Sequence, residues 1–197
     1  MKKLVISGAV FSLVLLFACT SNTSESENKE GDQRELEARY LEKGIDVTAK
    51  TFKTMSGHLM QAMQEGGIAN AVKFCNLNAY ALVDSIARSQ NVTIKRTSHK
   101  LRNKKNGPDP DEEKVIQDYL TQNEIPAPRV RIQEKSIRYF APIHVIDNCL
   151  KCHGTFNSTL KSSDYAVIQE LYPEDQAIGF EVGDLRGIWS LEFARNE

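Results

Sequence analysis

Residues 129–146, RVRIQEKSIRYFAPIHVI, decide the fold of this chain. The stretch predicts two β-strands joined as a hairpin, with an interruption near Glu134, Lys135 and Ser136. The pentapeptide CLKCH at residues 149–153 follows almost directly. A chemically distinctive motif therefore begins where the second strand is expected to end.

Helical patterns come before the hairpin. Apolar residues recur at mostly three- or four-residue steps from residue 36 to Gly66 and Gly67, which predicts a first helix, and a second apolar face at residues 68–86 predicts another. Shorter elements are expected further on: strands at 92–97, 177–182 and 187–193, a helix capped by Asp111 and running to Leu120, and a helix near 165–171. Helices followed by antiparallel strands predict an α+β fold with a sheet of about five strands.

The chain begins like an exported lipoprotein. Lys2 and Lys3 precede an apolar stretch, residues 4–17, that is too short to span a membrane comfortably and is typical of a signal peptide. It ends in Leu-Phe-Ala-Cys, which is similar to a bacterial lipobox and implies cleavage after residue 18 and lipidation of Cys19. An ordinary signal peptide with an incidental Cys19 is the alternative. We expect a membrane-anchored protein of the cell envelope that faces the periplasm.

The rest of the chain is expected to form a tether and one domain. Residues 20–34 contain no large apolar side chain and cannot bury a core, so residues 19–35 are predicted to be flexible. Residues 36–197 are long enough for a single domain with a sizeable core. The formal net charge is −1, and no basic stripe with interleaved aromatic residues occurs, so nucleic acid is not an expected partner.

The CLKCH motif predicts covalently attached haem. In a C-x-x-C-H pattern, Cys149 and Cys152 form thioether bonds to the haem and His153 binds its iron. A redox-active C-x-x-C pair and half of a zinc site are the alternatives. A zinc ribbon needs a second cysteine pair, which is absent, and a thioredoxin-like pair belongs in a βαβ setting that the pattern does not predict. The expected cofactor is haem c.

The residues alone leave the second axial ligand of the iron open. No methionine follows His153, which excludes the downstream Met ligand of small soluble cytochromes c. Cys75 is the one thiol assigned neither to lipid nor to haem, and it lies on the apolar face of the second predicted helix, where an ordinary core cysteine would also lie. The other candidates are His58, His99, His144, Met55, Met60 and Met63.

Four segments of the chain, taken in order, resemble the blocks of one known family. They are residues 71–87 (AVKFCNLNAYALVDSIA), 96–113 (RTSHKLRNKKNGPDPDEE), 142–154 (PIHVIDNCLKCHG) and 172–191 (YPEDQAIGFEVGDLRGIWSL). The family comprises bacterial c-type haem proteins with a PAS-like fold and a His/Cys-ligated iron, formerly a domain of unknown function. The resemblance covers nearly all of residues 36–194 and is more specific than the CLKCH motif alone.

The resemblance implies a role for each cysteine of the domain. Cys149 and Cys152 would be the thioether cysteines, His153 the proximal ligand and Cys75 the distal ligand, and a thiolate is an attested ligand of haem iron. Members of the family often carry Ala-Pro shortly after the helix cysteine. This chain has Ala79-Tyr80 instead, which predicts a straighter helix past Cys75.

Arg96 and Arg102 are candidate contacts for the haem propionates. Arginine binds a carboxylate through two parallel hydrogen bonds, and haem carries two propionates. A solvated basic loop is the alternative, because four lysines surround the two arginines: Lys95, Lys100, Lys104 and Lys105.

We expect a haem protein without enzymatic turnover. Full coordination by His153 and Cys75 argues against oxygen chemistry at an open iron, and an anionic thiolate predicts a low reduction potential. Two functions follow: a redox or diatomic-gas sensor that reports to a protein partner, and a low-potential periplasmic electron carrier. A peroxidase-like activity after Cys75 leaves the iron is a distant third.

Overall fold

The computed structural model describes residues 21–195, and contacts within the chain divide it into two units, Met1–Glu35 and Leu36–Glu197. The predicted signal peptide and Cys19 lie outside the described residues. Within residues 21–195, no helix is both long and apolar enough to cross a membrane.

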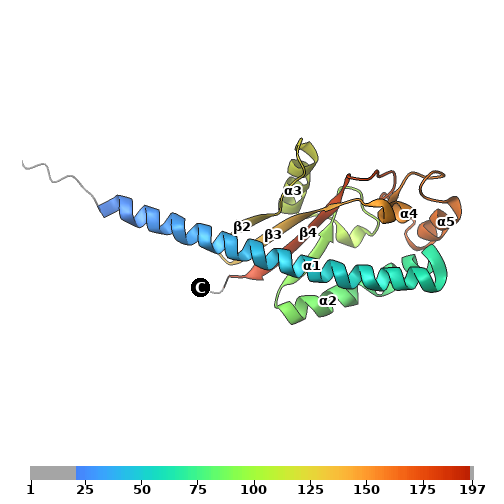
Figure 1. Ribbon diagram of the computed structural model, residues 1–197, viewed down its shortest axis with the longest axis horizontal. Coiled ribbons are helices and arrows are strands. Elements are labelled where there is room, and N and C mark those ends of the chain that lie inside the picture. Colours follow the sequence, from blue (N-terminus) through green and yellow to red (C-terminus); the bar gives the residue numbers. More distant parts are fainter. Residues whose placement is uncertain (1–20, 196–197) are drawn as a thin grey trace, which may run out of the picture. The chain divides into compact units, whose positions relative to one another are not determined.

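A four-stranded antiparallel sheet with the strand order β1-β4-β3-β2 organises the second unit (Figure 1). Its strands are β1 (Thr93–Thr97), β2 (Arg129–Ile132), β3 (Ser136–His144) and β4 (Leu185–Ala194). Strands β2 and β3 form the predicted hairpin, in which Val130 lies opposite Tyr139. On the other side of β3, Leu191 of β4 also pairs with Tyr139. The α+β prediction is confirmed.

Helices cover both faces of this sheet. From residue 36 on, α1 (Ser21–Leu77) lies with α2 (Ala79–Gln90) on one face, and α3 (Pro110–Thr121) lies on the other (Figure 1). Because successive side chains of a strand point to opposite faces, Tyr139 and Leu191 pack in the cluster beneath α1 and α2, whereas Phe140 and Ile188 pack beneath α3. The core is therefore two apolar layers separated by the sheet.

A kink divides α1 where the helical pattern was expected to end. Gly66 and Gly67 leave the helical conformation, and Gly67 has φ +69°, a backbone angle that favours glycine. The Asn70 side chain donates a hydrogen bond to the carbonyl of Ala62 across the kink, at 2.8 Å. The prediction of two helical segments that meet at Gly66 and Gly67 is confirmed.

A second interruption follows Cys75. α1 ends at Leu77 and α2 begins at Ala79, with Asn78 between them at φ −115°. The absence of proline at position 80 predicts a straighter helix past Cys75, and this stays a prediction. Asn78 keeps a right-handed helical conformation. The hydrogen bonds from its N–H to the carbonyl of Phe74, at 2.9 Å, and from the N–H of Leu82 to its own carbonyl, at 3.1 Å, continue the helical pattern across the interruption.

The segment 177–182 is not a strand, which corrects the predicted sheet of five strands to four. Its backbone groups bond elsewhere: the N–H of Gly179 donates to the carbonyl of Gly154 at 2.9 Å, and the N–H of Phe180 donates to that of His153 at 3.0 Å. Gly179 also has φ +74°, which an extended strand does not accommodate. The segment therefore closes over the CLKCH motif.

Asp109 caps α3, two residues before the predicted Asp111. The Asp109 carboxylate accepts a hydrogen bond from the N–H of Glu112 at 2.8 Å, and the Glu112 carboxylate accepts one from the N–H of Asp109 at 2.8 Å. This capping box satisfies two backbone donors at once, and Pro110 is well suited to the first helical position.

The stretch predicted to be a flexible tether is helical from Ser21 onward. α1 begins at Ser21, so residues 21–35 are helical. The stretch contains no proline and has four glutamates, and Arg34 pairs with Glu30 one turn away at 3.3 Å. Residues 28–35 are all exposed, in agreement with their polar composition.

Candidate functional site

The CLKCH motif forms one helical turn directly after β3. A 3₁₀ turn, η2 (Asp147–Cys149), leads into α4 (Leu150–His153), and the N–H of Gly154 closes the turn on the carbonyl of Leu150 at 2.9 Å. Residues three and four apart on a helix lie on one face, so Cys149, Cys152 and His153 share a face of this turn. Both thiols are free. The three side chains have the order and spacing that covalent haem requires.

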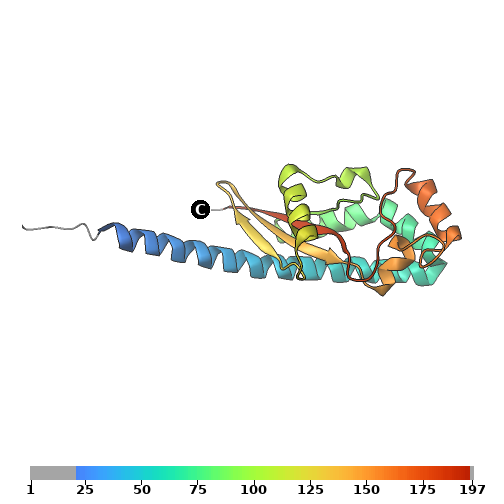
Figure 2. The same cartoon turned by 90° about the horizontal axis from the view of Figure 1, so that it is seen from above.

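α4 and α5 (Ser162–Leu171) lie beside the C-terminal segment of α1 in both views of the molecule (Figures 1 and 2). Cys152 packs against an apolar cluster that joins the three helices and includes Val72 of α1 and Ile168 of α5. This packing brings the motif close to the segment of α1 that carries Cys75.

His153 is held as a neutral imidazole. Its Nδ1 lies 2.7 Å from the carbonyl oxygen of Ala177. A carbonyl can only accept a hydrogen bond, so Nδ1 carries the proton and Nε2 keeps its lone pair. Burial and the nearby charges of Arg102 and Arg186 hold the pKa of His153 well below its usual range. A buried, oriented imidazole with a free Nε2 is the usual form of a histidine that binds a metal.

Arg102 contacts the backbone behind His153. Its Nη2 donates to the carbonyl oxygens of Cys152, at 2.5 Å, and of Ala177, at 3.2 Å. Its Nε and Nη2 also bind the two carboxylate oxygens of Asp175, at 3.2 and 3.0 Å. Asp175 in turn accepts a hydrogen bond from the N–H of Ala177 at 2.9 Å. Arg102, predicted to contact a propionate, is thus engaged with protein groups next to the motif.

Arg96 and Arg186 add positive charge to the same region. Among the described residues, neither has a carboxylate partner. Arg96 lies over the ring of Trp189, with its Cζ 5.7 Å from the ring centre. Arg186 donates to Ser98 Oγ at 2.9 Å and to the carbonyl of Lys100 at 3.2 Å, and its buried Nε has no partner. Burial and the charges of Arg102 and Arg96 lower the pKa of Arg186 to about 10.

Cys75 lies within electrostatic range of these groups, in the last turn of α1. Burial raises the pKa of its thiol, while the positive charges of Arg96 and Arg102 act in the opposite direction. Burial raises the pKa of Cys152, the second cysteine of the motif, to about 11, and the charge of Cys75 adds to this rise. The structure therefore brings together Cys75, Cys152, Arg96 and Arg102, which lie far apart in the sequence.

The other candidate ligands have varied surroundings. Met55 is buried in the core beneath the sheet, and His58 stacks on Phe74 at 5.9 Å. His99 meets the ring of Phe180 edge-on at 5.9 Å, and His144 donates from Nδ1 to the carbonyl of Gly183 at 3.0 Å. Met60 and Met63 lie on α1 before its kink. Within residues 21–195, no group of three or more His, Cys, Asp or Glu side chains is placed to hold a metal ion.

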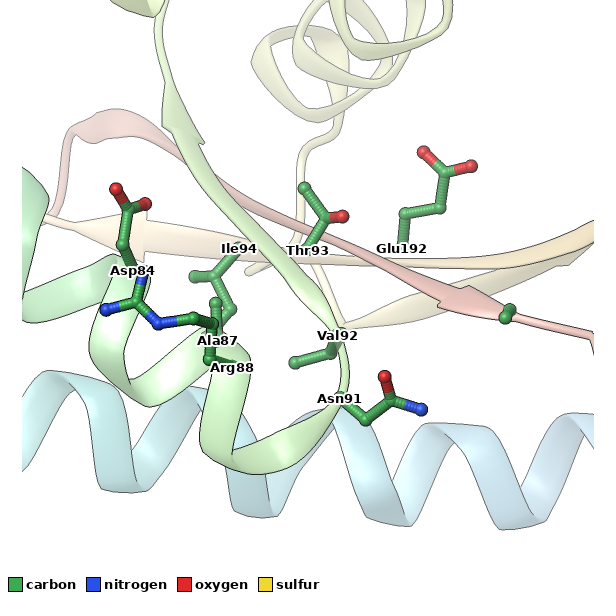
Figure 3. Close-up of a pocket in the computed structure, with 9 residues that line it drawn as sticks. Asp84, Ala87, Arg88, Asn91, Val92, Thr93, Ile94 and Glu192 are labelled. Carbon is green, nitrogen blue, oxygen red and sulfur yellow. The ribbon is translucent and has the colours of Figure 1, made fainter.

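An open groove lies away from the CLKCH motif, between the end of α2 and the start of β1 (Figure 3). Asp84 and Arg88 of α2 line it together with Thr93 of β1 and Glu192 of β4. Thr93 and Glu192 face each other at the far end of the β1–β4 pair from Thr97 and Ile188. None of the groove residues belongs to the predicted site.

Three parts of the site were not predicted as such: the carbonyl of Ala177, the carboxylate of Asp175 and the guanidinium of Arg186. A backbone acceptor carries no sequence signal, because every residue has a carbonyl. Asp175 and Arg186 are ordinary charged residues in turn-rich segments, and only the folded chain reveals their burial. The resemblance marked residues 172–191 as one block without assigning roles within it.

Comparisons with known proteins point to one family. A family model described as Tll0287-like matches residues 23–194. Among solved structures, the chain is similar to the cyanobacterial haem protein Tll0287, with 20% sequence identity, a TM-score of 0.58, and coverage of 79% of this chain and 97% of that one. At this identity the likeness is one of fold. No curated protein matches the chain.

Proposed function

The chain belongs to the Tll0287-like family, and on that premise we propose that it is a c-type haem protein whose haem is held by Cys149, Cys152 and His153. The observation that carries the proposal is the hydrogen bond from His153 Nδ1 to the carbonyl of Ala177. It orients a neutral imidazole on the same helical face as two free thiols. Bound haem would supply one-electron redox chemistry at its iron. Residues 36–197 would form a PAS-like domain.

Cys75 is the proposed distal ligand. Burial raises the pKa of its thiol, but the positive charges of Arg96 and Arg102 partly offset this rise and would stabilise a thiolate, which is the form that binds iron. The interaction of its charge with that of Cys152 further supports a common site. A thiolate stabilises ferric iron, so the proposed site has a low reduction potential.

Arg96 and Arg186 are the proposed propionate contacts. Each is a buried or half-buried guanidinium with no carboxylate partner among the described residues, so an external carboxylate would satisfy it. Arg102 is the weaker candidate for this role, because its Nε and Nη2 already donate hydrogen bonds to the carboxylate of Asp175.

The proposed role is that of a redox or diatomic-gas sensor. Cys75 lies in the last turn of α1, just before the interruption at Asn78, and the next helix packs against the sheet through Ala79 and Val83. If Cys75 moved when it left the iron, the adjoining helix α2 could transmit this movement to the sheet through the packing of Ala79 and Val83. A low-potential electron carrier, which would keep both ligands in both redox states, is the second candidate. Enzymatic turnover is not part of the proposal.

The remaining parts of the proposal concern the chain's surroundings. Lipidation of Cys19 would anchor the protein to a membrane, with the domain facing the periplasm. A sensor would pass its signal to a protein partner, and an electron carrier would exchange its electron with one.

Two measurements test the proposal. Haem is expected to stay with the polypeptide through acid–acetone extraction and denaturing electrophoresis, and replacing both Cys149 and Cys152 by Ser should abolish the haem-stained band. Persistence of that band in the double variant would disprove thioether attachment. Spectra of the ferrous protein with and without carbon monoxide then separate the two roles. Rapid binding of carbon monoxide to the iron supports sensing, and a spectrum that carbon monoxide leaves unchanged supports electron transfer.

A further inference from the structure

The carbonyl oxygen of Ala177 accepts hydrogen bonds from two side chains of the site. His153 donates to it from Nδ1 at 2.7 Å, and Arg102 donates to it from Nη2 at 3.2 Å. One donor is the neutral ring proposed to bind iron, and the other is a cation. The two donors share the lone pairs of one oxygen.

Side chains fix this arrangement rigidly. Asp175 binds Arg102 through both carboxylate oxygens, and one of these oxygens also accepts the N–H of Ala177 at 2.9 Å. The Asp175 side chain is 1% exposed and that of Arg102 is 13% exposed, so solvent competes little with these bonds. Arg102 and Asp175 therefore set where the Ala177 carbonyl points and how much of its electron density remains for His153.

The strength of the acceptor at Nδ1 controls the donor strength of a ligating histidine. A strong acceptor draws the Nδ1 proton away from the ring, raises the basicity of Nε2 and stabilises oxidised iron. A cation on the same acceptor oxygen withdraws electron density and weakens this effect.

We propose that Arg102 and Asp175 are positioning residues that tune the iron through the Ala177 carbonyl and His153, so that Arg102 serves the proximal histidine instead of a propionate. This inference rests on the proposed haem attachment and goes beyond it, because it assigns a redox-tuning role to two residues that touch neither iron nor haem thioether.

A pair of charge-conserving variants isolates this role. Arg102→Lys keeps the positive charge, but a lysine has one nitrogen and cannot hold both Asp175 oxygens and both carbonyls as the guanidinium fork does. Arg138→Lys is the matched control, because Arg138 is also a partly buried guanidinium bound to carboxylates, those of Asp109 and Glu112, but it makes no contact with Ala177. Both substitutions keep the positive charge, and both replace a guanidinium that binds carboxylates by a single ammonium.

Two measurements on the haem-loaded protein decide the outcome. In a Cys75→Ala background, the iron–histidine stretching frequency of the ferrous protein should rise with Arg102→Lys, because Nε2 becomes more basic, and stay unchanged with Arg138→Lys. With Cys75 present, the midpoint potential should shift downward with Arg102→Lys alone. Asp175→Asn, which releases Arg102, should also move the stretching frequency and covers the case in which Arg102→Lys fails to fold.

The outcomes separate the two proposals. If Arg102→Lys and Asp175→Asn both keep the stretching frequency and potential of their parents, the tuning role is overturned while haem attachment stands. If the unmodified chain carries no thioether-bound haem, the proposed function fails instead.

Discussion

Gly44 of α1 lies directly against the ring of Tyr139 in β3, and a β-carbon at position 44 would overlap ring atoms of that tyrosine. Tyr139 is fully buried at the centre of the sheet, between Val130 of β2 and Leu191 of β4. The close approach of α1 to the sheet therefore depends on the missing side chain.

Gly44→Ala is expected to lower the free energy of unfolding by about 1–3 kcal/mol, because the new methyl group forces α1 or Tyr139 out of place. Urea denaturation followed by circular dichroism measures the change. Gly57→Ala is the matched control, since Gly57 is an exposed residue of the same helix with no atom near its missing side chain. It should raise stability by about 0.5–1 kcal/mol, the usual preference for alanine in a helix. Equal effects of the two substitutions would contradict this account.

Asp109 should make stability depend on pH. Partial burial alone would raise the pKa of its carboxyl, but hydrogen bonds from Arg138 and from the N–H of Glu112, with the charges of Arg138 and Lys95, hold that pKa below its usual value. A depressed folded-state pKa contributes stability above the unfolded value of about 3.9, and this contribution disappears as the pH falls through the folded value.

Asp109→Asn tests this directly, because asparagine caps a helix as well as aspartate does but carries no charge. The variant should be less stable than the native chain at pH 7, by no more than about 1 kcal/mol since the Asp109 side chain is 41% exposed. In urea titrations, the difference should begin to shrink below about pH 4, near the unfolded-state pKa, and disappear below the folded-state pKa. A difference that stays constant from pH 7 to pH 3 would rule out the charge as its cause.

Cys75→Ala should convert ferric haem largely to a high-spin or water-ligated form and raise the reduction potential, because an anionic donor is lost. Electron paramagnetic resonance and redox titration measure both changes. The fold should survive, since removal of one thiol leaves a cavity that costs about 1–2 kcal/mol. His58→Ala serves as control and should keep the low-spin spectrum. If Cys75→Ala keeps it too, the distal ligand lies among the remaining histidines and methionines.

Cys19→Ser should leave an unprocessed precursor that incorporates no labelled palmitate, because lipidation requires the cysteine thiol. The native protein should resist extraction by salt and enter the detergent phase. Normal cleavage of the variant, together with release of the native protein by salt, would show that Cys19 is incidental to an ordinary signal peptide.

Local signals explain the elements that could be predicted. Two adjacent glycines end a helical repeat whatever packs around them, so the kink at Gly66 and Gly67 was visible in the sequence. The hairpin of β2 and β3 was visible for a similar reason, since neighbouring strands pair across a short interruption. The C-x-x-C-H spacing likewise identified Cys149, Cys152 and His153 without any knowledge of the fold.

Non-local bonds explain what could not be predicted. Residues 177–182 have the composition of a strand, but the N–H groups of Gly179 and Phe180 donate hydrogen bonds to the end of the CLKCH turn, more than 20 residues away in the sequence. The ion pair of Arg102 with Asp175 was not predicted, because a basic loop residue gives no sign of a buried carboxylate partner. The start of α3 was misplaced by two residues because Asp109 and Asp111 are both good caps, and only Asp109 has Glu112 in register.

The closure of residues 177–182 over the motif has a consequence for the order of events during maturation. The hydrogen bonds from Gly179 and Phe180 to Gly154 and His153 form only after residues 177–182 have been delivered. Until then, the turn that carries Cys149 and Cys152 lacks its cover. For the proposed haem attachment, this leaves an interval before residues 177–182 arrive in which a ligating enzyme can reach both thiols. If residues 177–182 covered the turn before haem was attached, they would block access to Cys149 and Cys152.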